Sequence, residues 1–230
     1  MFFFDPTYLC FMIPAFVLMG ITSWYVRSSY QKWSQVRVSS GLSGAQAAER
    51  LISSGGLYGV KIAGPPGQLS DHYDPRDKTL YLSPSVYQAP SVAAVAVAAH
   101  ELGHAQQDAE GYFPMRLRTF LVPAVNIGSN LGWILIMIGL LLRITELAWL
   151  GVIVFSAGAL FALATLPVEL NASSRAKELL YTTGIISTEE ERRGVNRVLN
   201  AAALTYVAGL ITAVLQLLYF VTLVGGRRRD

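Results

Sequence analysis

Four apolar blocks constrain the fold of this 230-residue chain more than any other feature of its sequence. A helix needs roughly 20 mostly apolar residues to cross a bilayer, and each block reaches that length. The blocks cover Pro6 to about Tyr25, Phe120–Leu142, Leu147–Leu166 and Ala201–Val224. With 53% hydrophobic and only 14% charged residues, the chain is also too apolar for an ordinary soluble domain. We therefore expect an α-helical integral membrane protein with about four transmembrane helices.

The charges around the first block predict an uncleaved signal anchor. No basic residue precedes the block, no clear small-residue cleavage site is present, and Arg27, Lys32 and Arg37 follow it. This pattern places the N-terminus outside and residues 27–121 in the cytoplasm. A cleaved signal peptide is the alternative interpretation.

The second and third blocks predict an antiparallel helical hairpin, because only Arg143–Glu146 separates them. The hairpin would return residues 167–200 to the side that holds residues 27–121, so both polar segments can build one site. The fourth block would then carry Arg227–Arg229 outside, against the positive-inside tendency. Either the early charges dominate the orientation, which we favour, or the fourth block is a re-entrant hairpin.

The polar segments between the blocks predict a small α+β domain. Ser43 with Gln46 has the pattern of a capping box that opens a short helix. The strand signals that follow indicate a small antiparallel sheet. The expected elements are strands at Gly59–Ala63, Gln68–Tyr73 and Lys78–Ser83, turns at Pro65–Gly67 and Asp74–Asp77, and a helix start at Ser91.

The chain then divides into an anchor at 5–26, a polar domain at 27–119, a transmembrane hairpin at 120–166, a second polar segment at 167–200 and a last transmembrane helix at 201–224.

The helix after Ser91 carries the H-E-x-x-H motif His100-Glu101-Leu102-Gly103-His104. Residues four apart lie on one face of a helix, so both imidazoles can bind a single ion. The glutamate between them can act as general base on a metal-bound water. The motif therefore predicts metal-assisted hydrolysis of an amide. The alternative is a helix surface with two ordinary histidines.

A third metal ligand is needed, because a catalytic zinc ion usually takes three protein ligands. His72, Asp108, Glu110 and Glu169 are the candidates. Glu169 is the best placed, because it directly follows a spanning block. An acidic group at the edge of a bilayer is costly, so its presence there indicates a function. It could instead be an acid favoured by a helix dipole. A glutamate from a second helix would make the arrangement gluzincin-type, with one Zn²⁺ per chain.

Three stretches of the chain resemble the YugP-type neutral zinc metallopeptidases of bacterial membranes. These stretches are His100–Gln107, Leu166–Ala176 and Asp71–Ser83. The resemblance covers nearly the whole chain, including the order of the apolar blocks. It implies that His100, His104 and Glu169 are zinc ligands and that Glu101 is the catalytic base.

HtpX-type membrane proteases, which pair H-E-x-x-H with E-x-x-A-D, are more distantly similar. This chain has Ser173 where they have the aspartate. Ser173 or Asn171 could still supply a hydrogen bond to a ligand histidine. Arg175 could brace Glu169 or a substrate carbonyl, although a plain charge on a helix face is the simpler interpretation.

Substrate contacts are predicted in the sheet that precedes the histidine helix. His72 could donate a hydrogen bond to a developing oxyanion, or it could anchor the turn that follows it. The strand Lys78–Ser83 could bind an extended peptide by adding a strand at the sheet edge. The substrate-binding candidates on this strand are Thr79, Leu80, Tyr81 and Leu82.

We therefore expect a multi-pass zinc metalloendopeptidase of the bacterial cell membrane, with a small α+β zincin-like catalytic domain on the cytoplasmic side. Its partners would be a peptide or membrane-protein substrate and the lipid bilayer. We expect no nucleic-acid partner, because the basic residues act as topology signals. A non-hydrolytic scaffold with a structural metal site is the alternative, but Cys10 is the single cysteine and lies far from the histidines. A transporter or channel is disfavoured because the spanning blocks carry almost no charge.

Overall fold

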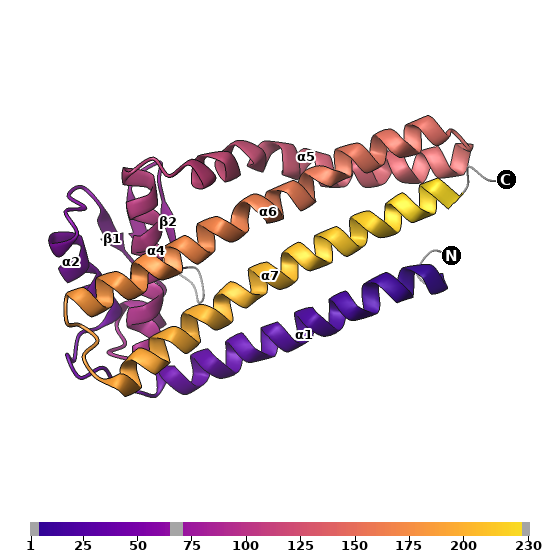
Figure 1. Ribbon diagram of the computed structural model, residues 1–230. Helices are drawn as coiled ribbons and strands as arrows, with labels where there is room; N and C mark the ends of the chain where they lie inside the picture. The colour runs from indigo at the N-terminus through magenta and orange to yellow at the C-terminus, as the bar shows by residue number, and fades with distance from the viewer. Residues whose placement is uncertain (1–4, 65–70, 227–230) are drawn as a thin grey trace. The chain divides into compact units, whose positions relative to one another are not determined.

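A computed structural model describes residues 5–64 and 71–226 of the chain. Four helices are long and apolar enough to cross a membrane by length and composition (Figure 1). They are α1 (Pro6–Ser34), α5 (Phe113–Leu142), α6 (Thr145–Thr182) and α7 (Glu189–Gly226). Each contains one of the predicted apolar blocks, so the expectation of a mainly helical chain with four candidate spans is confirmed. The arginines at 227–229 lie outside the described residues.

The shorter elements fall between α1 and α5 in the sequence. The helices are α2 (Gly44–Ser54), α3 (Pro84–Tyr87) and α4 (Val92–Ala109), and the strands are β1 (Lys61–Ala63), β2 (His72–Asp74) and β3 (Thr79–Tyr81). The predicted caps are present: Ser43 and Gln46 form a capping box at α2, and the Ser91 hydroxyl accepts a hydrogen bond from the Ala94 amide at the start of α4.

The chain divides into two compact units. One unit contains the chain up to Thr22, Phe113–Pro167 and the chain from Thr205 onward. The other contains Ser23–Tyr112 and Val168–Leu204. Helices α1, α6 and α7 each supply residues to both units.

The first unit is organised around the α5–α6 hairpin. Only Arg143 and Ile144 separate the two helices, so the predicted short connection is confirmed. A Cβ at Gly132 would lie 2.6 Å from the backbone nitrogen of Phe155, which shows that glycine permits a close approach of the helices. A small apolar cluster, formed by Ile136, Leu140, Ala148, Val152, Tyr219, Phe220 and Val224, joins this hairpin to α7.

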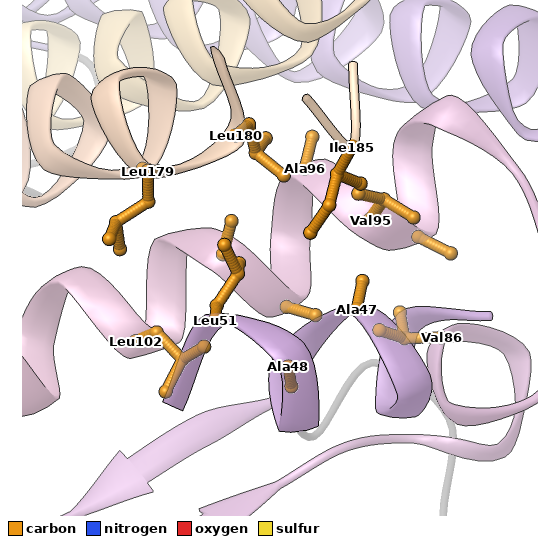
Figure 2. Packing of buried hydrophobic residues seen from close by; sticks show 14 of the residues in the cluster. Ala47, Ala48, Leu51, Val86, Val95, Ala96, Leu102, Leu179, Leu180 and Ile185 are labelled. Carbon is orange, nitrogen blue, oxygen red and sulfur yellow. The ribbon is translucent and has the colours of Figure 1, made fainter. Parts of the chain in front are cut away.

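The second unit has its core around α4, which is buried on nearly all sides. Small side chains fill its first half, so neighbouring helices can pack closely against it. Figure 2 shows this cluster with side chains from α2, α3, α4, the C-terminal end of α6 and the turn that follows α6. Its labelled members are Ala47, Ala48, Leu51, Val86, Val95, Ala96, Leu102, Leu179, Leu180 and Ile185.

The sheet of the second unit is mixed, and the prediction of an antiparallel sheet was wrong in this respect. The strand order is β1-β3-β2, with β1 parallel and β2 antiparallel to β3. Because β2 lies between β1 and β3 in the sequence, no tight hairpin turn forces β1 and β3 to run antiparallel. The predicted turn at Pro65–Gly67 and the first residues of the predicted strand Gln68–Tyr73 lie outside the described residues.

Candidate metal centre

The two histidines of the H-E-x-x-H motif meet Glu169 in the second unit. His100 and His104 lie one turn apart on α4, with their ring centroids 4.9 Å apart. Glu169 lies on α6 and is 2% exposed. One donor atom from each of these three residues lies within 4.8 Å of the others. The structure therefore brings together the three residues predicted as ligands.

The spacing of the donor atoms fits a zinc ion. Bonds of about 2.0–2.1 Å at tetrahedral angles place neighbouring donor atoms about 3.4 Å apart. Glu169 Oε2 lies 3.2 Å from His100 Nε2 and 3.6 Å from His104 Nε2. Two imidazoles with one carboxylate also form one of the ligand sets used by catalytic zinc.

Gln107 fixes which nitrogen of His104 faces Glu169. Gln107 is fully buried, and its Nε2 donates to the Val168 carbonyl oxygen at 2.8 Å and to Asn171 Oδ1 at 2.9 Å. Because both protons of this amide are used, Gln107 Oε1 is the atom that faces His104 Nδ1, at 3.0 Å. His104 Nδ1 must then carry the hydrogen. The lone pair on His104 Nε2 is left facing Glu169, as a metal ligand requires.

Ser173 orients His100 in a similar way. Its Oγ lies 3.2 Å from His100 Nδ1, so the hydroxyl accepts a hydrogen bond when Nδ1 carries the hydrogen. His100 Nε2 then also faces Glu169. Ser173 thus makes the contact expected of it, whereas Asn171 acts on His104 only through Gln107. Helix α6 supplies the third donor and anchors the groups that orient both histidines.

The lone pairs of the two imidazole nitrogens repel the buried Glu169 carboxylate that they face. A cation or a proton between these three groups would remove this repulsion. Burial alone would lower the pKa of His104. The hydrogen bond to Glu169 and the charges of Glu101 and Glu169 outweigh burial, so the pKa of His104 is raised above its ordinary value of 6.5. A divalent cation would neutralise the same negative potential.

Gly103 allows α4 to approach α6 closely. A Cβ at this position would lie 2.5 Å from the carbonyl oxygen of Ala172 and 3.0 Å from its Cα. Side chains do not pack at such distances, so the contact between the helices requires glycine. Because His100 and His104 flank Gly103 on α4, this contact controls their distance from Glu169.

Glu101 is the carboxylate available for proton transfer. It is half-buried on α4, and its charge helps to raise the pKa of His104, so the carboxylate lies near the cluster. Within the described residues, the structure assigns it no hydrogen bond or ion pair. Glu169, by contrast, is engaged with both histidines.

The other acidic candidates for the third ligand have different partners. Asp108 accepts a hydrogen bond of 2.9 Å from the Tyr73 hydroxyl, and burial together with this bond raises the pKa of Tyr73. Glu110 forms an ion pair of 2.6 Å with Arg175, which lowers the pKa of Glu110. Arg175 also donates to Asn171 Oδ1 at 2.7 Å, the same atom that accepts from Gln107, so it braces Asn171 and Glu110 beside α4.

His72 and the predicted substrate strand lie differently from what was expected. Tyr73 points towards α4, so its strand neighbour His72 faces the opposite side, where it stacks on Tyr81 with centroids 4.9 Å apart. This placement favours the structural alternative for His72. Because β3 is the central strand, the prediction that Thr79–Leu82 add a peptide at a sheet edge was wrong. Both edges of β3 are paired, and Leu80 and Leu82 are fully buried.

Sequence reasoning assigned no role to Gln107 or Gly103. The signal for Gln107 was its position three residues after His104, which puts it on the same helical face. A polar side chain that is buried on this face of the helix needs buried hydrogen-bond partners. No local signal identifies Gly103, because its role depends on the position of Ala172 on another helix.

Comparisons with known proteins point in the same direction as this geometry. Residues 8–225 match a protein family described as "Putative neutral zinc metallopeptidase". The chain is 44% identical over 216 residues to a Bacillus subtilis protein named "Putative membrane protease YugP", covering 93% of this chain and 96% of the relative. No solved structure matches the chain.

Proposed function

Since this chain belongs to the neutral zinc metallopeptidase family, we propose that it is a membrane-embedded zinc metalloendopeptidase that hydrolyses peptide bonds. One observation carries the proposal: the Nε2 atoms of His100 and His104 face Glu169 Oε2 at 3.2 and 3.6 Å. These three residues would hold one zinc ion per chain. A metal ion in such a site lowers the pKa of water to about 7 and polarises the scissile carbonyl.

Glu101 would move the protons of the reaction. Its carboxylate accepts a proton from the water that attacks the carbonyl carbon and passes this proton to the leaving amine. Its half-buried position supports this role, because the group can reach both water and substrate. Gln107 and Ser173 keep the two histidines in the required tautomer and orientation.

A gluzincin-type, zincin-like domain is the arrangement that these elements support. The H-E-x-x-H helix α4 contacts β2 of the small sheet, and a second helix, α6, donates the glutamate. β2 is an edge strand, so an extended peptide could pair with it in place of the central strand β3. Backbone pairing of this kind would give broad sequence specificity.

The position of the metal centre in the sequence supports substrates that lie close to the lipid. Glu169 directly follows the apolar segment of α6, so the metal centre is close in sequence to a candidate span. The charges Arg27, Lys32 and Arg37 after the first apolar segment support a cytoplasmic position for the catalytic domain. Membrane proteins, or protein segments delivered near the bilayer, are the proposed substrates.

A pair of glutamate variants tests the proposal. Purified full-length protein would be incubated with casein, with and without a chelator, and its zinc content would be measured in parallel. Glu101→Gln should abolish cleavage and leave zinc bound, whereas Glu49→Gln, an exposed change on α2, should leave both unchanged. Full activity in Glu101→Gln, or cleavage by the wild type that resists the chelator, would refute the mechanism.

A further inference from the structure

A basic groove is formed by the C-terminal end of α1 and the N-terminal end of α7, apart from the residues of the metal centre. The two helix ends lie side by side (Figure 1) and belong to the same compact unit. The groove has a volume of ≈ 450 Å³, within the range of small-molecule sites. Tyr25, Lys32, Trp33, Glu190, Arg193 and Arg197 are among its lining residues. We call it the α1–α7 groove.

The charge of the α1–α7 groove is positive. Lys32, Arg193 and Arg197 contribute three positive charges and Glu190 one negative charge. Within the part of the chain that the structure describes, no ion pair neutralises any of the three cations. Their exposed side chains are therefore available to an anion.

Aromatic rings hold two of these cations in place. The Arg197 guanidinium carbon lies 5.6 Å from the centroid of the Tyr25 ring, and Lys32 Nζ lies 5.2 Å from that of Trp33. Trp33 is only 5% exposed and packs against Gly194, where an added Cβ would lie 2.5 Å from the indole. Its indole N–H has no hydrogen-bond acceptor among the described residues. The groove thus has a buried aromatic wall beside exposed, positively charged side chains.

The groove lies where two candidate spans leave their apolar segments. Tyr25 ends the apolar segment of α1, and Arg197 comes one helical turn before the apolar segment of α7 begins at Ala201. Trp24, next to Tyr25, is 69% exposed, as aromatic residues at a membrane–water interface commonly are. The cations are therefore at the level expected for lipid headgroups.

From this arrangement we propose that the α1–α7 groove binds the phosphate group of an anionic phospholipid. Arg193 and Arg197 would contact the phosphate oxygens, and the acyl chains would remain in the surrounding bilayer. Asn200, at the membrane-proximal end of the groove, accepts a hydrogen bond of 2.8 Å from Lys177 and brings a fourth cation close to it. Basic pockets between spanning helices recognise anionic headgroups in this way.

Native mass spectrometry of the full-length chain in detergent tests the proposal directly. The chain would be titrated with dioleoylphosphatidylglycerol, with dioleoylphosphatidylcholine, and with phosphatidylglycerol in the presence of inorganic phosphate. Phosphatidylglycerol should bind more tightly than phosphatidylcholine. Equimolar inorganic phosphate should not displace it, because the acyl chains contribute to binding. Displacement by inorganic phosphate would overturn the lipid assignment in favour of a free-phosphate site.

Three variants assign the binding to the groove. Each cation near an anionic group contributes about fivefold in affinity, so Arg193→Gln combined with Arg197→Gln should weaken phosphatidylglycerol binding about 25-fold. The matched pair Arg27→Gln and Arg37→Gln, which removes the same charge outside the groove, should change it by less than about twofold. Glu190→Gln should strengthen binding about fivefold, which gives a gain that misfolding cannot produce.

Two results would overturn the proposal: an equal loss in both arginine pairs, or no loss in the groove pair. Zinc content and thermal unfolding, measured on each variant, check that the chain is folded. The lipid site does not depend on proteolysis, so the binding result stands apart from the casein assay.

Discussion

Replacing Gly103 by alanine should separate the two helices that form the metal centre. The added Cβ would lie 2.5 Å from the Ala172 carbonyl oxygen, whereas ordinary contact begins at 3.4 Å. Relief of this overlap requires a shift of about 0.9 Å, the difference between these distances. Ligand distances in metal sites tolerate only about 0.2 Å. The shift therefore exceeds what the contacts from His100 and His104 to Glu169 can absorb.

We expect Gly103→Ala to weaken zinc binding by at least about 100-fold, more than loss of an orienting hydrogen bond commonly costs. Competition with a chromophoric zinc chelator measures the affinity, and casein cleavage should fall in parallel. Alanine is favoured over glycine inside a helix by about 1 kcal/mol, so helix propensity would act in the opposite direction. Gly209→Ala on α7, where nothing lies within 4 Å, is the matched control and should leave zinc affinity unchanged. A wild-type zinc affinity in Gly103→Ala would refute the argument from helix contact.

Two further predictions concern His104. Gln107→Leu removes the acceptor at His104 Nδ1 and should weaken zinc binding about 10–100-fold in the same competition assay. Gln106→Leu is the control and should leave zinc affinity unchanged. Equal zinc affinities in the two variants would contradict the role of Gln107. In the metal-free chain, the raised pKa of His104 favours the protonated ring, so its stabilising contribution is complete below about pH 6.5 and is lost as pH rises through the raised pKa. Zinc binds only the neutral ring of His104, so the zinc affinity should fall at least about tenfold per pH unit below that pKa. A zinc affinity independent of pH would contradict this prediction.

Local patterns made much of the fold predictable from the sequence. The spanning helices follow from the length of their apolar segments, and the caps at Ser43 and Ser91 follow from hydrogen bonds within one turn. The α5–α6 hairpin follows from a connection too short for any other arrangement. Each of these features depends on residues close together in the chain.

Features that depend on distant residues were not predictable in the same way. The parallel pairing of β1 with β3 is determined by register between separated segments, and it converts the proposed edge strand into a central one. The partners of Asp108 and Glu110 became visible only when Tyr73 and Arg175 had positions in space. Glu169 could be ranked first beforehand, because a carboxylate beside a spanning segment is costly without a partner.

The zinc content of Glu169→Ala, compared with wild type and with Asp108→Ala, tests the central claim most directly. Plasma mass spectrometry of the purified full-length chain would give the number of zinc ions per chain. With His100, His104 and Glu169 as the ligands, wild type and Asp108→Ala should retain about one zinc ion per chain, and Glu169→Ala should lose it. Full zinc occupancy in Glu169→Ala, together with loss in Asp108→Ala, would contradict the metal centre described above.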